Sequence, residues 1–343
     1  MMIELTANNA ADYLRQRGWI GDDPASIEPL GGGVSNAVLR VETQDRLFVL
    51  KQSRPQLRTR DAWFSDLERV YREQEVMQAL APLLPPYTVP EVLFIDRANY
   101  VFAMAHAPRG AKVWKAQLLA GDIDFALGEH AGRILGCIHE ATARDPHLTE
   151  RFADRNVFFQ LRVDPYYRRI QERRPEVADA VAPLIERLMT AREALCHGDY
   201  SPKNILTHEH GFTLVDYETA HLGDPTMDLG FCLSHLLLKA VKRSHDRQRH
   251  FELTRRFWQG YTAETTFLPH IELQRRGIEH CGVCLLARID GTSPVEYLPE
   301  EDKREAVRQL GCGLLLERPR CWEEVLGLAE KLLTESHIRK GPG

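Results

Sequence analysis

The sequence contains no run of eighteen apolar residues, and its 343 residues include only seven cysteines. The first absence argues against a helix that spans a membrane. The first residues also lack a basic segment followed by an apolar one, so they do not indicate a secretory signal. An odd and sparse set of cysteines is typical of reduced thiols rather than of a disulfide framework. We therefore expect a cytoplasmic protein.

The sequence also lacks a strong excess of either charge. Its 44 Lys and Arg residues against 49 Asp and Glu residues give a net charge of -5, which argues against a broad cationic surface. Neither nucleic acid nor a membrane is therefore an expected partner. Hydrophobic residues make up 43% and charged residues 27%, as in ordinary globular proteins. A chain of this length exceeds the usual size of one compact core, so we expect two lobes.

The first part of the chain predicts a small sheet with one long helix. Residues 10–19 predict a short helix, and residues 27–53 predict two or three strands, because β-prone residues alternate there with turn residues. Residues 61–80 carry apolar side chains at a helical period. Two further strand candidates follow, at residues 91–96 and 100–107.

Beyond this point helical patterns dominate, at residues 125–143, 176–195, 228–241, 250–264, 277–289 and 322–336. The change of pattern is the best candidate for a domain boundary. We predict an α+β fold in which residues 1–106 form an N-terminal lobe, with a small antiparallel sheet and one helix. Residues 107–343 then form a larger and mostly helical C-terminal lobe.

A short polar segment, HGDYSPKNIL at residues 197–206, carries the strongest chemical signal. Pro202 breaks any helix between Asp199 and Asn204, and the apolar run that follows predicts a hairpin with FTLVD, which ends on Asp216. The ends of that hairpin would bring Asn204 and Asp216 together. Amide and carboxylate oxygens suit Mg²⁺, and Asp199 is then available to orient or deprotonate a hydroxyl. This spacing matches the template for phosphoryl transfer.

Each of these residues also has an ordinary structural explanation. An isolated Asp or Asn at a turn is usually a cap, but three at matched spacing favour a functional role. We interpret His197 and His221 as structural hydrogen-bonding residues, because magnesium prefers oxygen ligands. Cys281 and Cys284 form a lone pair of thiols beside a histidine, and their helical surroundings favour a place in the core over a zinc site.

Phosphoryl transfer also needs groups that hold the phosphates. The segment LGGGVSNAVLRV offers backbone amides and one hydroxyl at a turn between strands: Gly31, Gly32, Gly33 and Ser35. Lys51 follows an apolar run in the next strand, and a buried lysine there requires a carboxylate. Glu73 lies on the inward face of the predicted helix, and Glu75 is the alternative partner.

With these residues assembled, the chain resembles the aminoglycoside phosphotransferase and choline kinase family of small-molecule kinases. This family shares a two-lobed fold with protein kinases. HGDYSPKNIL is similar to its catalytic loop, and FTLVDYETAHLGDPTMDLGF to its metal-binding strand and the helix after it. REQEVMQALAPLLPPYTVPEVLFID is similar to its glutamate helix and next strand. With the glycine loop and the lysine strand, the resemblance covers most of the chain.

The resemblance implies an enzyme that uses ATP and Mg²⁺ to phosphorylate a hydroxyl of a small molecule. It implies that Asp199 is the catalytic base, that Lys51 holds the nucleotide phosphates, and that Glu73 pairs with this lysine. The implied magnesium ligands are Asn204 and Asp216, with Glu218 as a further candidate.

The resemblance also implies two supporting segments. FAMAHAPRG would be the hinge between the lobes, where adenine contacts Met104, Ala105 and Ala107. Asp224 and Asp228 would be structural aspartates that support the catalytic loop.

Several segments resemble methylthioribose kinases in particular, among them GGVSNAVLRV, VLKQSRPQLR, WKAQLLAGDI and LARIDG. Two segments depart from them. The residues after the catalytic aspartate read YSPKN where those kinases typically have His-Thr-Gly-Ser, and Ala287-Arg288 replaces a paired arginine. The acceptor therefore stays open among sugars, thio-sugars, amino alcohols and aminoglycosides. Arg288 could meet an anionic or sugar-like acceptor, or form a salt bridge.

Two other classes of protein fit the sequence less well. A pseudokinase that binds nucleotide as a regulatory module would usually have lost the lysine or a metal ligand, whereas this chain keeps Lys51, Asp199, Asn204 and Asp216. A protein kinase is disfavoured because no activation segment with a later APE-like motif follows Asp216. The oligomeric state is not indicated by the sequence.

Overall fold

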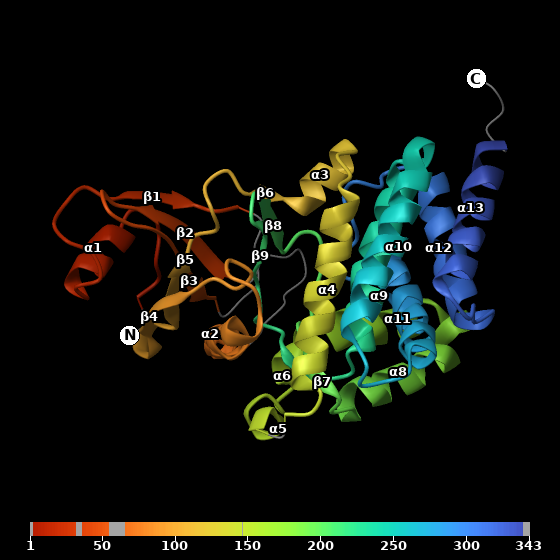
Figure 1. Ribbon diagram of the computed structural model, residues 1–343, viewed down its shortest axis with the longest axis horizontal. Helices are drawn as coiled ribbons and strands as arrows, with labels where there is room; N and C mark the ends of the chain where they lie inside the picture. The colour runs from red at the N-terminus through yellow and green to blue at the C-terminus, as the bar shows by residue number, and fades with distance from the viewer. Residues whose placement is uncertain (1–2, 32–35, 55–65, 146, 339–343) are drawn as a thin grey trace. The chain divides into compact units, whose positions relative to one another are not determined.

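The computed structural model describes residues 3–31, 36–54, 66–145 and 147–338. The chain forms two compact units (Figure 1). The first unit comprises Met1–Ala111 together with Leu206–Thr219, and the second comprises Lys112–Ile205 together with Ala220–Gly343. The sheet of the first unit and the helices of the second confirm the predicted α+β fold class.

A five-stranded sheet is the centre of the first unit. Its strands lie in the order β1-β2-β3-β5-β4, and every neighbouring pair is antiparallel. Their bounds are β1 Ser26–Pro29, β2 Asn36–Glu42, β3 Leu47–Ser53, β4 Val92–Asp96 and β5 Val101–Ala105. This arrangement confirms the predicted antiparallel sheet. Helix α1, Ala10–Gln16, packs through Tyr13 and Leu14 on a core that includes Val41 and Phe48.

The long helix of the first unit is shorter than predicted. It forms α2, Arg69–Leu80, and ends where the pattern indicated. Its predicted start at Asp61 lies outside the described residues, and residues 66–68 are not helical. The Asp66 carboxylate there accepts the Glu68 N–H at 2.9 Å, and such a local turn competes with the helix.

A hairpin from later in the chain completes the first unit. Strands β8, Ile205–His208, and β9, Gly211–Leu214, are paired as the sequence predicted. The Leu214 N–H donates to the Thr88 carbonyl at 2.8 Å, and the Thr213 hydroxyl donates to the Tyr87 carbonyl at 2.8 Å. These hydrogen bonds tie residues 206–219 to the sheet-containing unit, although they are distant from it in sequence.

The second unit is mostly helical. Its helices α4, α10, α9 and α11 lie side by side (Figure 1), and α12 packs between α11 and α13. A small antiparallel pair joins β7, Ala194–Cys196, to β10, His221–Gly223. The other elements are β6 Lys112–Val113, α3 Trp114–Ala120, α4 Phe125–Thr142, α5 His147–Arg151, α6 Asn156–Phe158, α7 Arg169–Arg173, α8 Ala178–Thr190, α9 Thr226–Lys242, α10 Arg247–Glu264, α11 His270–Asp290, α12 Glu301–Leu316 and α13 Trp322–Ile338.

One predicted helix of this unit ends early. The pattern at residues 176–195 predicted a single helix, but α8 ends at Thr190 and Ala194–Cys196 form strand β7 instead. Ala191 is already non-helical at ψ 143°, and the Leu195 N–H donates to the Thr142 hydroxyl at 2.9 Å. Pairing with β10 therefore overrides the helical periodicity.

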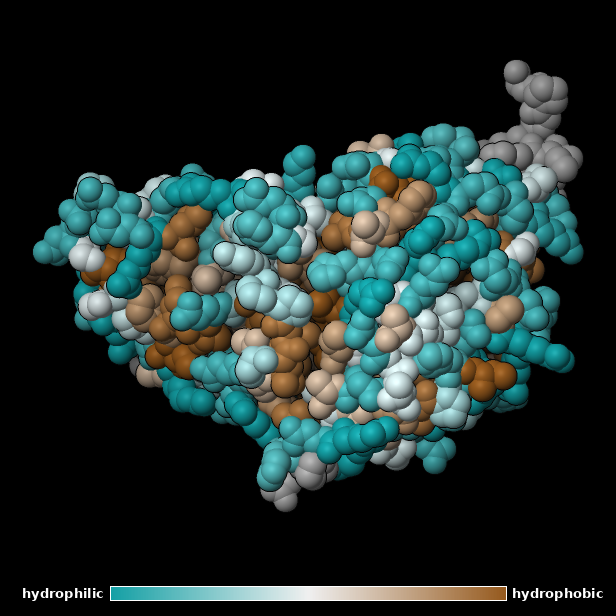
Figure 2. Space-filling view, viewed as in Figure 1, coloured by the Kyte–Doolittle hydropathy of each residue, from teal (hydrophilic) through white to brown (hydrophobic). Residues whose placement is uncertain are grey.

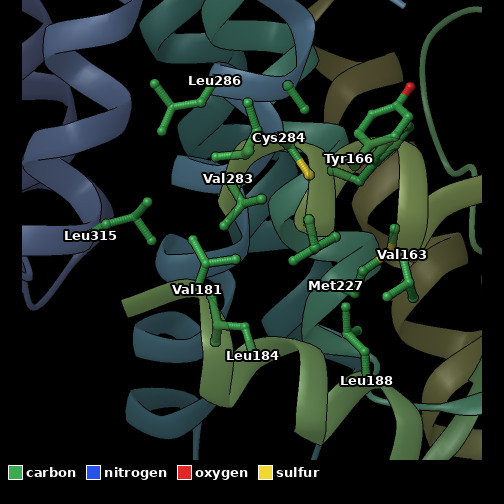
Figure 3. Close-up of a cluster of buried hydrophobic side chains, with 14 of the residues drawn as sticks. Val163, Tyr166, Val181, Leu184, Leu188, Met227, Val283, Cys284, Leu286 and Leu315 are labelled. Carbon is green, nitrogen blue, oxygen red and sulfur yellow. The ribbon is translucent and has the colours of Figure 1, made fainter. Parts of the chain in front are cut away.

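A large apolar cluster fills the interior of the second unit (Figure 3). Figure 3 shows Val181 and Leu184 of α8, Met227 of α9 and Cys284 of α11 within it. Burial raises the pKa of the Cys284 thiol to about 12, so the thiol stays protonated as a core residue does. Cys281 is buried as well, and neither thiol forms a disulfide.

Helices α4 and α10 approach each other so closely that Gly132 has no room for a side chain. A Cβ atom at this position would lie 1.9 Å from the Phe257 carbonyl oxygen, which belongs to the backbone and cannot move aside. We expect Gly132→Ala to lower the free energy of unfolding by about 3 kcal/mol, measured by urea denaturation. The matched control is Gly327→Ala in α13, where a Cβ would meet nothing within 4 Å.

Because alanine has a higher helix propensity than glycine, the control should raise the free energy of unfolding by about 0.5 to 1 kcal/mol. Equal effects of the two substitutions would contradict the close approach of α4 and α10.

On the face shown in Figure 2, hydrophilic residues cover much of the second unit, with hydrophobic residues visible between them. Among the described residues, no helix is both long and apolar enough to cross a membrane.

Candidate active site

The predicted site residues fall in both units. In the first unit, strand β3 places Lys51 in the interior, where it is 4% exposed. Its ammonium lies 2.6 Å from the Glu73 carboxylate and 2.9 Å from that of Asp216. Burial alone would lower the pKa of Lys51, but the charges of Asp216, Glu73 and Glu218 outweigh it and raise that pKa. The lysine is therefore held in its charged form.

The glutamate that contacts Lys51 is Glu73, which is fully buried on α2. Glu75, the alternative, lies two residues further and contacts Arg97 at 3.4 Å. Burial raises the pKa of Glu73, and Lys51 offsets part of that rise. The inward face of the helix therefore selects the glutamate, as its spacing from the apolar residues suggested.

Asp216 and Glu218 follow strand β9 and bring further carboxylates to the same place. Asp216 has a φ of 72°, a left-handed conformation that is uncommon outside glycine and often marks functional positions. Glu218 accepts hydrogen bonds from the Asn36 amide at 2.8 Å and from the Arg69 guanidinium at 3.1 Å. Sequence reasoning missed Asn36 and Arg69, because a lone polar residue at a strand or helix start carries no signal of a distant partner.

The remaining nucleotide-site candidates of the first unit are the glycine loop and the hinge residues. Gly31 lies exposed after β1, whereas Gly32, Gly33 and Ser35 lie outside the described residues. In strand β5, the side chain of Met104 is buried. The Ala105 N–H donates to the Glu91 carbonyl at 2.8 Å. Ala105 and Ala107 line a cavity of about 410 Å³ that also borders Thr213 and His210.

In the second unit, Asp199 lies on a tight loop after β7. Gly198, just before it, has a φ of 75°, which glycine adopts without steric cost. The carboxylate of Asp228 accepts the N–H groups of His197 at 2.6 Å and of Gly198 at 2.8 Å. Burial alone would raise the pKa of Asp228, but hydrogen bonding from His139 and the His197 backbone lowers it. Asp228 thus stays ionised and fixes the loop.

Two cations contact the Asp199 carboxylate. Its Oδ2 atom lies 2.7 Å from the Arg162 guanidinium and 2.9 Å from the Lys203 ammonium. Arg162 belongs to a π-helical segment, Phe159–Arg168, and also donates to the Gly198 carbonyl at 2.8 Å. π-Helical segments are rare and frequently occur at functional sites. Neither cation was a sequence-based candidate, although Lys203 lies inside the quoted loop motif.

Asn204 is held by the same loop. Its side-chain nitrogen donates to the Asp199 carbonyl at 2.9 Å, so its amide oxygen is the atom that a cation would meet. The structure thus groups Lys51, Glu73 and Asp216 in the first unit, and Asp199 with Asn204 in the second. The approach of Asn204 to Asp216 stays a prediction.

The other polar residues of the motif region have structural contacts. The Asp224 carboxylate lies beside the Arg276 guanidinium and 2.7 Å from that of Arg187. His197 accepts the Asp199 N–H at 3.2 Å, and His221 stacks on Phe158 with ring centroids 3.7 Å apart. These contacts agree with the interpretation of both histidines as structural.

The donor set of the first unit fits a hard divalent cation. Carboxylate oxygens of Glu73, Asp216 and Glu218 lie within 4.8 Å of one another. Among the described residues, Lys51 and Arg69 lie beside these three acids. Carboxylate oxygens are the ligands that Mg²⁺ prefers, and it keeps part of its hydration shell.

Comparison with known proteins identifies the family of this chain. A model of the phosphotransferase enzyme family matches residues 26–268. A methylthioribose kinase of Pectobacterium atrosepticum is 26% identical over 325 residues, which cover 82% of this chain and 80% of that protein. A methylthioribose kinase of Exiguobacterium sibiricum is 24% identical, covering 71% of this chain and 69% of that one.

Solved structures share the fold at low sequence identity. An ethanolamine kinase of Plasmodium vivax superposes with a TM-score of 0.55 at 12% identity, covering 95% of this chain and 86% of that one. A choline/ethanolamine kinase family protein of Mesorhizobium loti gives a TM-score of 0.53 at 18% identity, covering 95% of this chain and 100% of that one. At such identities the likeness supports the fold alone.

Proposed function

The chain belongs to the phosphotransferase enzyme family, and from this premise we propose that it is an ATP- and Mg²⁺-dependent kinase of a small-molecule hydroxyl. The observation that carries the proposal is the buried Lys51, held charged between Glu73 and Asp216. A lysine fixed in this way is a ready partner for anionic phosphate oxygens. Such an arrangement has a clear use in phosphoryl transfer, where positioning and charge stabilisation supply most of the catalysis.

In the proposed reaction, the acceptor hydroxyl oxygen forms a bond to the terminal phosphorus of ATP. The bond between that phosphorus and the bridging oxygen breaks, and ADP leaves with the bond's electron pair. Asp199 orients the hydroxyl and takes its proton as the new bond forms. Arg162 and Lys203, at 2.7 and 2.9 Å from this carboxylate, hold it in position.

The candidate Mg²⁺ ligands are Asp216 and Glu218 of the first unit and Asn204 of the second, and the metal would neutralise charge on the nucleotide phosphates. The residues of the chain have separate tasks: Lys51 would bind phosphate oxygens, and Glu73 would orient Lys51. The hinge residues Met104, Ala105 and Ala107, and the glycine loop with Gly31, would contact the nucleotide. An acceptor from the classes of sugars, thio-sugars, amino alcohols and aminoglycosides would complete the site.

Removal of divalent metal tests the proposal. The purified protein should transfer labelled phosphate from ATP to at least one member of an acceptor panel when Mg²⁺ is present. EDTA should abolish the transfer, and added Mg²⁺ should restore it, because a polyphosphate resists attack until its charge is neutralised. Thin-layer chromatography of the labelled products measures both effects. Nucleotide binding without transfer to any hydroxyl acceptor would instead favour the pseudokinase alternative.

A further inference from the structure

Four cationic side chains gather in the second unit, and we call them the cationic cluster: Lys115 of α3, Lys203 of the Asp199 loop, Lys239 of α9 and Arg288 of α11. The ammonium groups of Lys115 and Lys239 both lie near the ring of Tyr297. Burial, followed by the charges of all four residues, lowers the pKa of His235 well below its ordinary value. Segments far apart in the sequence thus bring positive charge to one place.

One member of the cluster, Lys203, pairs with the Asp199 carboxylate at 2.9 Å, and the other three are placed differently. Lys239 is fully buried and donates to the His235 carbonyl at 2.9 Å. In the described part of the chain, Lys115, Lys239 and Arg288 form no ion pair within 4.0 Å. Several other buried cations of this protein have carboxylate partners, among them Lys51 with Glu73, Arg69 with Glu218, and Arg276 with Glu193. The buried Arg155 instead donates to backbone carbonyls, among them that of Leu222 at 2.8 Å. Of Lys115, Lys239 and Arg288, only Lys239 is fully buried, and burial favours its neutral form. A ligand that supplies the opposite charge would favour its protonated form.

Polar and aromatic groups surround the cluster. The ammonium groups of Lys115 and Lys239 lie 5.6 and 5.4 Å from the ring centroid of Tyr297. The Tyr297 hydroxyl is buried and has no hydrogen-bond partner among the described residues. Arg288 donates to the Tyr166 hydroxyl at 3.1 Å, which fixes its guanidinium. The cluster thus combines positive charge with a hydroxyl that can donate to a ligand oxygen.

The cluster is connected to the proposed catalytic base. Lys203 lies 2.9 Å from the Asp199 carboxylate, and Arg162 lies 2.7 Å from it. The Arg162 guanidinium also lies 5.8 Å from the ring centroid of Tyr166, the residue whose hydroxyl accepts from Arg288. A small molecule whose hydroxyl meets Asp199 would therefore have the cationic cluster beside it.

We propose that the cationic cluster recognises the acceptor, and that the acceptor carries an anionic group, a carboxylate or a phosphate, in addition to the hydroxyl that is phosphorylated. This inference rests on the proposed function and names its substrate class. Cationic acceptors such as amino alcohols and aminoglycosides would be repelled. The nucleotide phosphates are the other anions near a kinase site, but the first unit has Lys51 for them.

The titration of Lys239 provides an additional test. Burial, then the charges of Lys115 and Arg288, lower the pKa of Lys239 to about 7. The other groups that act on this region are His235 and Cys232 of the same helix, Lys203, and the exposed Glu296, whose charge acts on Lys115. An anion favours the protonated ammonium, so its binding should take up a proton and weaken as pH rises above about 7.

The experiment compares wild-type protein with Lys239→Met and with Lys242→Met as a matched control. Lys242 lies on the same helix, but it is paired with Glu300 at 3.2 Å. The acceptors assayed with labelled ATP are similar sugar derivatives that differ in charge: gluconate is anionic, glucose is neutral and glucosamine is cationic. Glucose 6-phosphate tests a phosphate in place of the carboxylate. Calorimetry with gluconate or inorganic phosphate, in buffers of different protonation enthalpy, measures anion binding and proton uptake directly.

We expect gluconate or glucose 6-phosphate to give the highest kcat/KM. Lys239→Met should raise the KM for that anion roughly tenfold or more, leaving the KM for ATP unchanged. Because methionine removes a buried charge, this variant should melt no lower than wild type, which separates lost binding from lost folding.

Preferred transfer to glucose or glucosamine would overturn the inference while leaving the kinase proposal intact. An equal loss in the Lys242→Met control, or a loss of ATP affinity in Lys239→Met, would also overturn it. Anion binding that depends on Lys239 but leads to no transfer would support the anion site and reject the proposed kinase.

Discussion

Asp199→Asn is expected to lower kcat by about a thousandfold or more, because an amide cannot take the proton of the acceptor hydroxyl. ATP binding should change little, since the proposed phosphate contacts belong to Lys51 of the first unit. Asparagine has nearly the same size as aspartate, and Asp228 still holds the N–H groups of His197 and Gly198. The loop should therefore keep its conformation. Single-turnover kinetics with labelled ATP measure the chemical step, and fluorescence titration measures nucleotide affinity.

The control for this variant is Asp164→Asn, which removes a carboxylate from the same π-helical segment that carries Arg162. Asp164 is 52% exposed in its side chain and pairs with Arg168 on the surface at 3.3 Å. Its loss should leave kcat unchanged, because exposed ion pairs contribute little. Full activity of Asp199→Asn would remove Asp199 from the mechanism. Equal losses in both variants would point to damage of the segment rather than to chemistry at Asp199.

Much of the fold was predictable because local periodicity and turn residues agree with the tertiary structure. Strands β2 and β3 and helix α4 lie where their patterns indicated. The exceptions are segments whose structure is determined by contacts with residues distant in the sequence. Residues 194–196 pair with β10 instead of extending α8, and residues 206–219 join the first unit through hydrogen bonds to residues 87 and 88. The composition change near residue 106 gives no indication that residues 206–219 return to the first unit.

The candidate site was predictable to the extent that its residues share short motifs. Glu73 could be chosen over Glu75 because helical spacing fixes which side chain faces inward. Arg162 and Arg69 have no comparable signal, since each reaches its carboxylate from a distant segment. The burial of Lys239 is harder to predict. A lysine within an apolar helical pattern is normally expected on the exposed face, yet Lys239 is fully buried.

Asp216 belongs to the carboxylate cluster of Glu73, Asp216 and Glu218, and its substitution is expected to have a large effect on activity. Asp216→Asn keeps a side chain that can still accept the Lys51 hydrogen bond, observed at 2.9 Å, so the first unit should remain folded. It removes one of the three clustered carboxylates that would attract a divalent cation. We expect turnover at 1 mM Mg²⁺ to fall at least about a hundredfold. A titration of activity against Mg²⁺ and Mn²⁺ should show a higher metal requirement.

The matched control is Asp45→Asn, in the exposed turn between β2 and β3, which should leave both activity and metal requirement unchanged. The titration separates two roles of Asp216. If the carboxylate mainly holds metal, excess Mg²⁺ restores part of the turnover of Asp216→Asn. If it mainly orients Lys51, added metal restores nothing and the KM for ATP rises instead. Wild-type activity of Asp216→Asn at low Mg²⁺ would contradict both roles, because neither Mg²⁺ binding nor the orientation of Lys51 would then depend on this carboxylate.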